Sequence, residues 1–196
     1  KPTVFVCASA IGFYGNRGQE TISEDSPPGQ GFLADVCKDW ESATRPAAEA
    51  GIRTVHLRIG VVLSPDGGAL AKMLPPFRMG LGGKLGKGNQ GMSWVVLDDV
   101  VGATLHVLKT ETVSGPVNLV SPNPVSNLVF TKTLGNVLRR PTIFPLPSSV
   151  ARVAFGEMVD DLLLASTKVQ PKRLQESDYE FRFPELDGAL RHLLKR

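Results

Sequence analysis

The chain has 196 residues, of which 42% are hydrophobic and 21% are charged, and its formal net charge is +3. This composition is typical of a globular protein with one hydrophobic core and room for a small attached unit. The basic residues are spread along the sequence, and no apolar run reaches the roughly 18 residues of a membrane helix, so we expect neither a nucleic-acid nor a membrane partner.

The first elements predicted along the chain are two buried strands separated by a helix. The apolar run 4–8 is short and continuous, which is typical of a strand buried on both faces of a parallel sheet. Residues 33–44 place apolar side chains at helical spacing. A second buried strand follows at 54–63, with a bend at Gly60. This order predicts a right-handed strand–helix–strand unit.

The middle of the chain continues with alternating helices and strands. A helix opens at 69–74, and we expect Pro75 and Pro76 to disturb it, because proline lacks the N–H that a helix interior needs. Asp98 is predicted as the N-cap of a helix that runs to about Lys109, since its carboxylate can accept the free N–H groups of the first turn. A loop, a strand and a helix are predicted at 80–91, 117–120 and 127–139.

From Pro141 the sequence changes character. Prolines cluster at 141–147, and short helical runs follow around 150–155, 156–165 and 184–194. We therefore divide the chain into a partial nucleotide-binding domain, residues 1–140, and a small helical domain, residues 141–196.

The predicted fold class is α/β, the C-terminal portion of a doubly wound parallel sheet (Rossmann-like) with a small helical appendage. A doubly wound fold begins with a strand, a glycine-rich turn and a helix. Here the first strand runs into Ser-Ala-Ile-Gly-Phe-Tyr-Gly at 9–15. We therefore expect that the first half of the fold, roughly 80–100 residues, is absent, and that cofactor binding needs it.

Ser9 and Tyr14 are the candidate catalytic residues. Open α/β sheets bind ligands at the carboxyl ends of their strands, and Ser9 ends the first strand. Its hydroxyl is suited to hydrogen-bond a substrate oxygen, and the Tyr14 phenol is predicted near the same rim. The alternative is that the serine caps the strand and the tyrosine packs under a loop.

A literal G-x-G-x-x-G stands at 86–91, but no strand precedes it and no helix follows, so it is not the dinucleotide motif. Lys84 and Lys87 nevertheless suit a phosphate, and the alternative is a solvated loop. Trp94 is predicted either to line the substrate cleft or to be a buried core residue. Arg58 ends a buried strand, so it either forms a structural ion pair or holds an anionic ligand.

The two cysteines, Cys7 and Cys37, form no Cys-x-x-Cys pair, and the chain has only three histidines. No metal-ligand spacing results, and no metal site is expected. The same cysteine usage predicts a reduced, cytoplasmic compartment.

As a set, these motifs resemble an extended short-chain dehydrogenase/reductase. The similarity is to the epimerase/dehydratase-like subfamily that includes plastid and cyanobacterial proteins linked to cell division, and the end of the chain resembles that subfamily's appended domain of unknown function. The segments that carry it are 9–15, 23–27, 40–41, 57–63, 67–70, 75–78, 80–83, 93–94, 98–99, 156–157 and 171–174.

The resemblance implies an NAD(P) cofactor, with NADP favoured, and a small-molecule or nucleotide-linked substrate. Ser9 matches the family serine, and the loop that carries Lys84 and Lys87 would approach the sugar nucleotide. Trp94 completes the predicted substrate-binding set. The resemblance places residues 59–61 beside the cofactor. The full predicted cofactor-binding set is Ala8, Ser9, Ala10, Arg58, Ile59, Gly60 and Val61.

The chain departs from the family at the catalytic helix. The wider superfamily uses a tyrosine with a lysine four residues later, because a phenol of pKa about 10 needs a neighbouring cation to work near neutral pH. Neither Tyr14 nor Tyr179 has such a lysine, and Leu33 and Cys37 occupy the two positions. Tyr14 is the preferred stand-in, and Cys37 is more simply a core residue.

Two functions remain open from the sequence. One is an NAD(P)-dependent epimerase, dehydratase or reductase of unknown substrate. The other is a non-catalytic NAD(P)-binding regulatory module. A homodimer is also left open.

Overall fold

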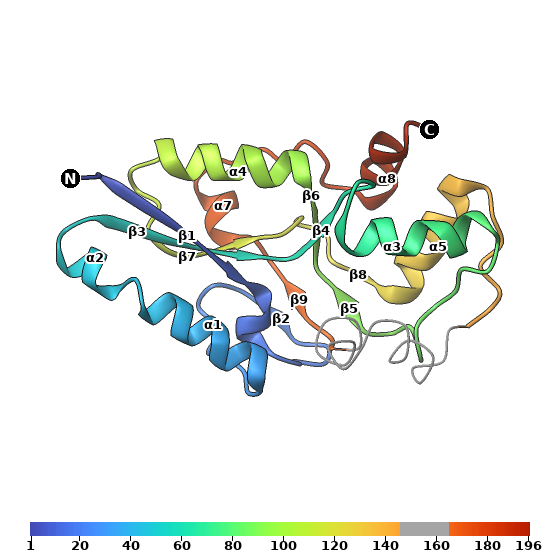
Figure 1. Ribbon diagram of the computed structural model, residues 1–196, viewed down its shortest axis with the longest axis horizontal. Coiled ribbons are helices and arrows are strands. Elements are labelled where there is room, and N and C mark those ends of the chain that lie inside the picture. Colours follow the sequence, from blue (N-terminus) through green and yellow to red (C-terminus); the bar gives the residue numbers. More distant parts are fainter. Residues whose placement is uncertain (146–164) are drawn as a thin grey trace.

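The computed structural model describes residues 1–145 and 165–196. A parallel sheet lies at its centre, with helix α4 over one face and helices α1 and α2 over the other (Figure 1). The strand order is β1-β3-β7. The bounds of these elements are β1 Val4–Ala10, β3 Arg53–Ile59, β7 Gly115–Leu119, α1 Phe32–Ser42, α2 Arg45–Glu49 and α4 Leu97–Lys109.

The three strands are apolar on the face that α4 covers. Val55 and Leu57 of β3 pack there with Val117 of β7 and with Ala103 and Val107 of the helix. A sheet buried on both faces favours near-continuous apolar strands. The predicted burial holds for β3, but for β1 it is wrong, because β1 pairs with β3 alone among the described residues and Phe5 and Ala8 are exposed. The predicted parallel α/β architecture is confirmed, because β1 and β3 pair in parallel along their whole length.

The second predicted strand is broken where the glycine stands. β3 ends at Ile59, and the chain resumes after Gly60 as β4 (Val61–Leu63), which pairs with β6 (Trp94–Val96) instead. A Cβ on Gly60 would lie 2.7 Å from Val120 Cγ1 and 2.8 Å from the Ser93 carbonyl oxygen. Only glycine fits this close approach, so the predicted bend is confirmed.

Two expectations about helices are wrong. Helix α3 (Gly68–Arg78) continues through Pro75 and Pro76 rather than breaking there. Its apolar face, which includes Leu74, is buried in the core, and that packing outweighs the local cost of the prolines. Asp98 is not the N-cap. Helix α4 begins one residue earlier, so Asp98 lies inside its first turn, where its negative charge still interacts favourably with the helix dipole.

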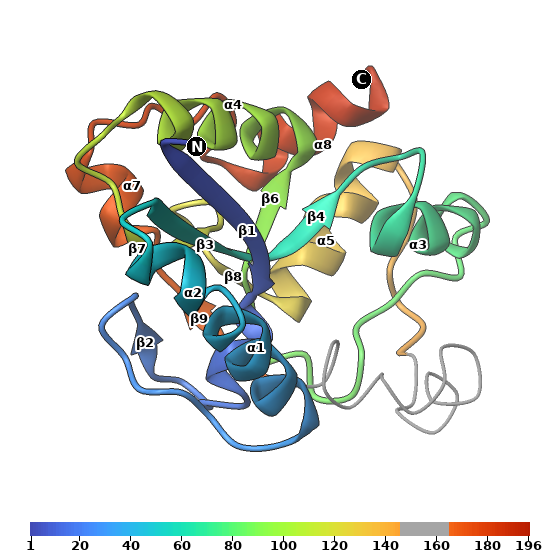
Figure 2. The same cartoon turned by 60° about the vertical axis from the view of Figure 1, so that its left-hand side comes forward.

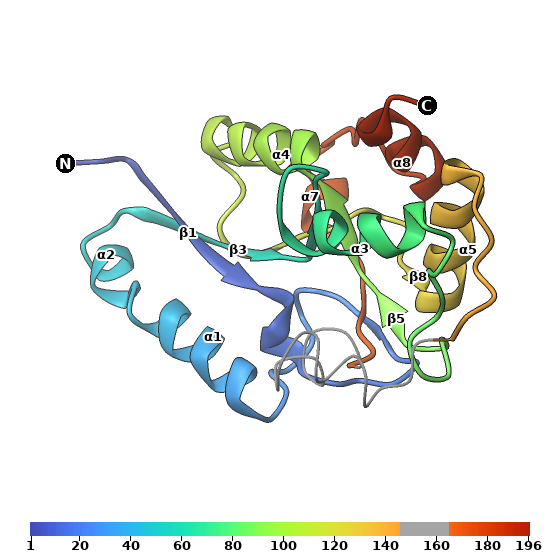
Figure 3. The same cartoon turned by 45° about the vertical axis from the view of Figure 1, so that its right-hand side comes forward.

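Helices from the middle and the end of the chain form a second apolar cluster, in which α3, α5 and α8 lie together (Figure 3). Ser126 caps α5 by accepting a hydrogen bond from the Val129 N–H. The elements not yet bounded are η1 Ile11–Tyr14, β2 Thr21–Ile22, β5 Gly91–Met92, β8 Val125–Ser126, α5 Asn127–Leu138, β9 Lys168–Val169, α7 Lys172–Glu176 and α8 Leu186–Leu194.

The described C-terminal residues pair with and hydrogen-bond to earlier parts of the chain. Strand β9 pairs with β2, and the carboxylate of Asp99 on α4 accepts the backbone N–H groups of Arg182 and Phe183. The predicted helix at 184–194 is confirmed as α8. The helical runs predicted around 150–155 and 156–165 lie outside the described residues, apart from Ala165, and the boundary at 141–147 stays a prediction.

No helix within residues 1–145 and 165–196 is long and apolar enough to cross a membrane.

Candidate functional site

A row of polar side chains crosses the carboxyl end of the sheet. Ser9 of β1 is in register with Arg58 of β3, which is in register with Asn118 of β7. All three are buried, and Ser9 is only 4% exposed. Because residues in register on neighbouring strands point to the same face, the three polar groups meet beneath α1.

Glu41, in the last turn of α1, is the partner of two of them. Both oxygens of its carboxylate accept from Arg58, at 2.8 Å from Nε and 2.8 Å from Nη2. The hydroxyl of Ser9 donates to Glu41 Oε1 at 2.9 Å. This is a bidentate, charge-assisted pair with the serine as a third contact.

The Glu41–Arg58 pair is charged in the folded protein. Burial acts to raise the pKa of the Glu41 carboxyl, but the hydrogen bonds and positive charge of Arg58 outweigh it, and the pKa is lowered. Burial likewise acts to lower the pKa of Arg58, and Glu41 reverses that effect. An ionised carboxylate can only accept, so the single proton of Ser9 is committed to Glu41.

Tyr14 occupies the other side of the guanidinium. Its ring is completely buried, its hydroxyl accepts from Arg58 Nη1 at 2.9 Å, and it donates to Asn118 Oδ1 at 2.7 Å. The Arg58 guanidinium also lies 3.5 Å from the centre of the Phe13 ring. Burial raises the pKa of the Tyr14 phenol. The structure thus places Tyr14 inside the protein rather than at an open rim, with its proton bound to another residue.

The network ends at a second buried carboxylate. Glu24 Oε1 accepts the backbone N–H of Asn118 at 2.9 Å and that of Arg173 at 3.3 Å, while Oε2 is buried without a partner among the described residues. Burial raises the pKa of this carboxyl. Glu24 therefore fixes the loop 23–27 to β7 and to the start of α7.

Cys37 lies one helical turn before Glu41 on the same face of α1. It is buried, and burial raises the pKa of its thiol. A raised pKa disfavours the reactive thiolate, which agrees with the prediction of a core residue.

The residues expected beside the cofactor lie at the same edge of the sheet. Ala8 is exposed, and Ala10, Ile59, Gly60 and Val61 are half-buried. Arg58 also belongs to this expected set, but its guanidinium hydrogen bonds point to Glu41 and Tyr14 within the protein.

The loop that carries Lys84 and Lys87 is held at the start of α5, where the Leu85 N–H donates to Asn127 Oδ1, and by Gln19, whose Nε2 donates to the Asn89 carbonyl oxygen. The loop after Lys84 and Lys87 leads into the short strand β5, so the glycine pattern at 86–91 does not open a helix. Trp94 does not line a cleft. It is fully buried, and its Nε1 donates to the Asn123 carbonyl oxygen.

The residues at the ends of the three central strands fit one end of a dinucleotide. The carboxyl ends of β1, β3 and β7 meet at one edge, which is where doubly wound sheets hold the nicotinamide. Within the described part of the chain, no strand leads through a glycine-rich turn into a helix in the manner that holds a pyrophosphate. The same residues include no cluster of side chains that could hold a metal ion.

Sequence reasoning missed Glu41, Asn118 and Glu24 as members of this network. The signal for Glu41 was the buried arginine itself, because a guanidinium on a core strand requires a carboxylate. Nothing in the sequence identifies which carboxylate it is, since Glu41 lies 17 residues away in the chain.

Comparison with known proteins places the chain among longer relatives. Residues 146–193 match a domain of unknown function, DUF1731. An epimerase family protein of Mycobacterium tuberculosis is 45% identical over 189 residues, which are 96% of this chain and 63% of that protein. The human epimerase family protein SDR39U1 is 37% identical over 194 residues, 98% of this chain and 66% of that protein. The chain therefore spans less than two thirds of these relatives.

Two solved structures of relatives match the fold of this chain. A crystal structure of human SDR39U1 with NADPH has a TM-score of 0.93 at 36% identity and covers all of this chain and 66% of that one. The nucleoside-diphosphate sugar epimerase of Corynebacterium glutamicum has a TM-score of 0.78 at 37% identity, over 98% of this chain and 37% of that one.

Proposed function

We propose, since the chain belongs to the epimerase-like family of extended short-chain dehydrogenases/reductases, that it holds the nicotinamide end of NAD(P) without the usual tyrosine-based catalysis. The observation that carries the binding is the parallel order β1-β3-β7, whose strand ends meet at one edge. NADPH in the human relative's structure supports the same cofactor here.

The backbone at this edge would hold the ring. Ala10 and Ile59 end neighbouring strands in register, so their peptide groups lie side by side at the site. Gly60 lets the chain turn directly after Ile59. The cofactor, when bound, supplies hydride transfer at its nicotinamide, and the protein's part is to orient it.

The contacts of Ser9 and Tyr14 argue against catalysis by these residues. Each hydroxyl proton is donated to a buried partner, Glu41 and Asn118 respectively. A general acid must deliver a proton to the substrate, and releasing either proton would break a buried hydrogen bond. This favours a binding module over an enzyme that uses Tyr14 as its acid.

The second candidate is an NAD(P)-dependent epimerase, dehydratase or reductase. It is supported by the family's name among the relatives and by the position of Ser9 at the end of β1. In that case Ser9 would offer its lone pairs rather than its proton, because the proton is bound to Glu41.

The test is an NADPH titration of the chain fused to the part of the Mycobacterium tuberculosis relative that lies outside the aligned residues, because we expect cofactor binding to need the first half of the fold. Saturation-transfer NMR on the nicotinamide protons follows. We expect binding, and no oxidation of NADPH against a broad panel of carbonyl compounds. Ala8→Trp places a bulky side chain at the edge and should weaken binding, whereas Ala48→Trp, also at an exposed alanine but on α2, should not. Turnover that Ser9→Ala abolishes would establish the enzyme instead.

A further inference from the structure

A polar cavity of about 330 Å³ lies where α7 faces the turn between α4 and β7. Figure 2 shows α7 beside β7, below the end of α4. Ser114 directly precedes β7, so the cavity lies at the amino ends of the parallel strands, opposite the proposed cofactor edge. Its volume falls at the lower end of the range for small-molecule sites, about 300–1,000 Å³. The residues that line it are Thr112, Val113, Ser114, Arg173, Glu176 and Ser177.

Helix α7 presents one charge of each sign to this cavity. Arg173 and Glu176 are three residues apart, so their side chains share one face of the helix. The carboxylate of Glu176 is only loosely paired, because Oε1 lies 4.0 Å from Lys172 Nζ, and that ammonium binds Asp25 more closely, at 2.7 Å. Glu176 is therefore able to bind a second cation.

The Arg173 guanidinium is fixed at the wall of the cavity. Its Nη1 donates to the carbonyl oxygens of Ser114 and Pro116, each at 2.9 Å. Gly115, between them, has a φ of 71°, and a Cβ there would lie 3.1 Å from Nη1. Nη2 lies 3.9 Å from an oxygen of Asp25, and within the described part of the chain neither Nε nor Nη2 forms a hydrogen bond. These two groups keep their N–H donors for an anion.

Three hydroxyl groups complete the lining. Those of Thr112 and Ser114 are exposed and form no hydrogen bond among the described residues, so both can donate to an anion beside the guanidinium. The hydroxyl of Ser177 differs, because it donates its single proton to the Leu174 carbonyl oxygen at 3.0 Å. His106 Nε2, 3.0 Å from Ser177 Oγ, is therefore the donor in their contact, and Ser177 keeps one lone pair for an N–H group.

From these features we infer that the cavity binds a small zwitterion, an α-amino acid with a polar side chain. Its carboxylate pairs with Arg173 and the two exposed hydroxyls, and its ammonium pairs with Glu176 and Ser177. A simple anion would be repelled by the carboxylate of Glu176, and a simple cation by the guanidinium, so a ligand with both charges fits best. Val113 is the single apolar residue of the lining, which favours a polar side chain. This inference does not depend on cofactor binding.

The experiment titrates L-glutamine, a polar amino acid, into the fusion described above for NADPH and follows the backbone amides by NMR. Two related compounds each lack one charge: N-acetyl-L-glutamine has no ammonium, and L-glutaminamide has no α-carboxylate. We expect saturable shifts at the amides of Ser114 and Arg173 with L-glutamine. Each of the other two compounds should bind about fivefold more weakly, the upper range for a partly exposed ion pair.

Glu176→Gln should weaken L-glutamine about fivefold and strengthen N-acetyl-L-glutamine, because the charge that attracts the ammonium also repels an anion. Glu180→Gln is the matched control, since Glu180 is an exposed carboxylate outside the lining. Equal affinities for L-glutamine and N-acetyl-L-glutamine would overturn the proposal, because the cavity would then be an anion site. So would the lack of a saturable shift below about 10 mM. Loss of NADPH binding in the same fusion would count against the proposed function only.

Discussion

The hydroxyl of Ser9 donates to Glu41 Oε1 at 2.9 Å across 32 residues of sequence. The contact joins the end of β1 to the last turn of α1. It also ties the residue that matches the family serine to the Arg58 ion pair, so the candidate site and the buried core share one network.

Glu41→Ala should destabilise the fold strongly. It leaves the Arg58 guanidinium buried, with Tyr14 as its remaining side-chain hydrogen-bond partner, and breaking a buried pair in this way typically costs about 3–5 kcal/mol. Urea denaturation measures the loss. The control is Asp35→Ala, which removes an exposed ion pair with Lys38 on the same helix and should change stability little. Equal effects of the two changes would contradict the structural role of Glu41.

Tyr14→Phe should lower stability by about 1–3 kcal/mol, because Asn118 Oδ1 loses its donor and Arg58 Nη1 its acceptor in the interior. NADPH affinity should stay unchanged, since the phenol does not reach the sheet edge. Thermal melts and NADPH titrations of the same protein measure both quantities. Unchanged stability with lost turnover would show that Tyr14 acts on a substrate after all.

Glu24→Gln should remove one contribution to the pH dependence of the free energy of unfolding. Because burial raises the pKa of Glu24 in the folded state, the contribution of its protonated form is present at low pH and is lost as the pH rises from the unfolded value through the raised folded one. The glutamine keeps an oxygen for the N–H groups of Asn118 and Arg173. We expect the variant to be more stable than the parent at pH 7.5.

The comparison for Glu24→Gln is a series of melting temperatures between pH 4 and pH 7.5. Glu176→Gln, at an exposed carboxylate on α7, is the control and should follow the parent at every pH. Glu41 has the opposite sign: its lowered pKa means that its contribution is present above the unfolded value and is lost as the pH falls through the folded one. A variant Glu24→Gln that loses stability at pH 7.5 would refute the assignment.

Gly60→Ala should disrupt the junction between β3 and β4. Its Cβ would lie 2.8 Å from the Ser93 carbonyl oxygen, which is backbone and cannot turn aside. Gly188→Ala in α8 meets nothing within 4 Å and should instead stabilise by about 0.5–1 kcal/mol, because alanine is the better helix former. We expect the melting temperature to fall in Gly60→Ala and to rise in Gly188→Ala.

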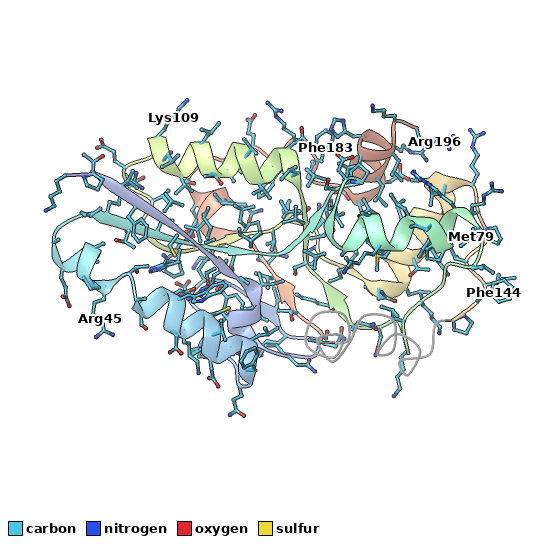
Figure 4. The ribbon with its side chains drawn as sticks, viewed as in Figure 1. Arg45, Met79, Lys109, Phe144, Phe183 and Arg196 are labelled. Atoms are coloured by element: carbon cyan, nitrogen blue, oxygen red, sulfur yellow. The ribbon has the colours of Figure 1, made fainter. Side chains whose placement is uncertain are left out.

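Two exposed apolar residues, Met79 and Phe144, lie away from α4. Both side chains lie at the end of the molecule opposite the start of β1 (Figure 4). Lys109 marks the end of α4 at the opposite end of the same view.

Local pattern was enough to predict the parallel strands, the bend at Gly60 and the helix that carries Cys37. These features depend on residues close together in the sequence, because a short window of apolar residues is enough to show the spacing of a strand or a helix. The helix through Pro75 and Pro76 was mispredicted for the complementary reason, since its stability comes from packing against distant residues.

The sequence by itself determined the fold class and the presence of Ser9, Tyr14 and Arg58 near strand ends. Only the tertiary structure decided that all three are joined to one another through Glu41 and Asn118. The physical reason is that a hydrogen bond depends on distance and direction between groups that are up to 104 residues apart, and no local pattern encodes which buried donor meets which acceptor.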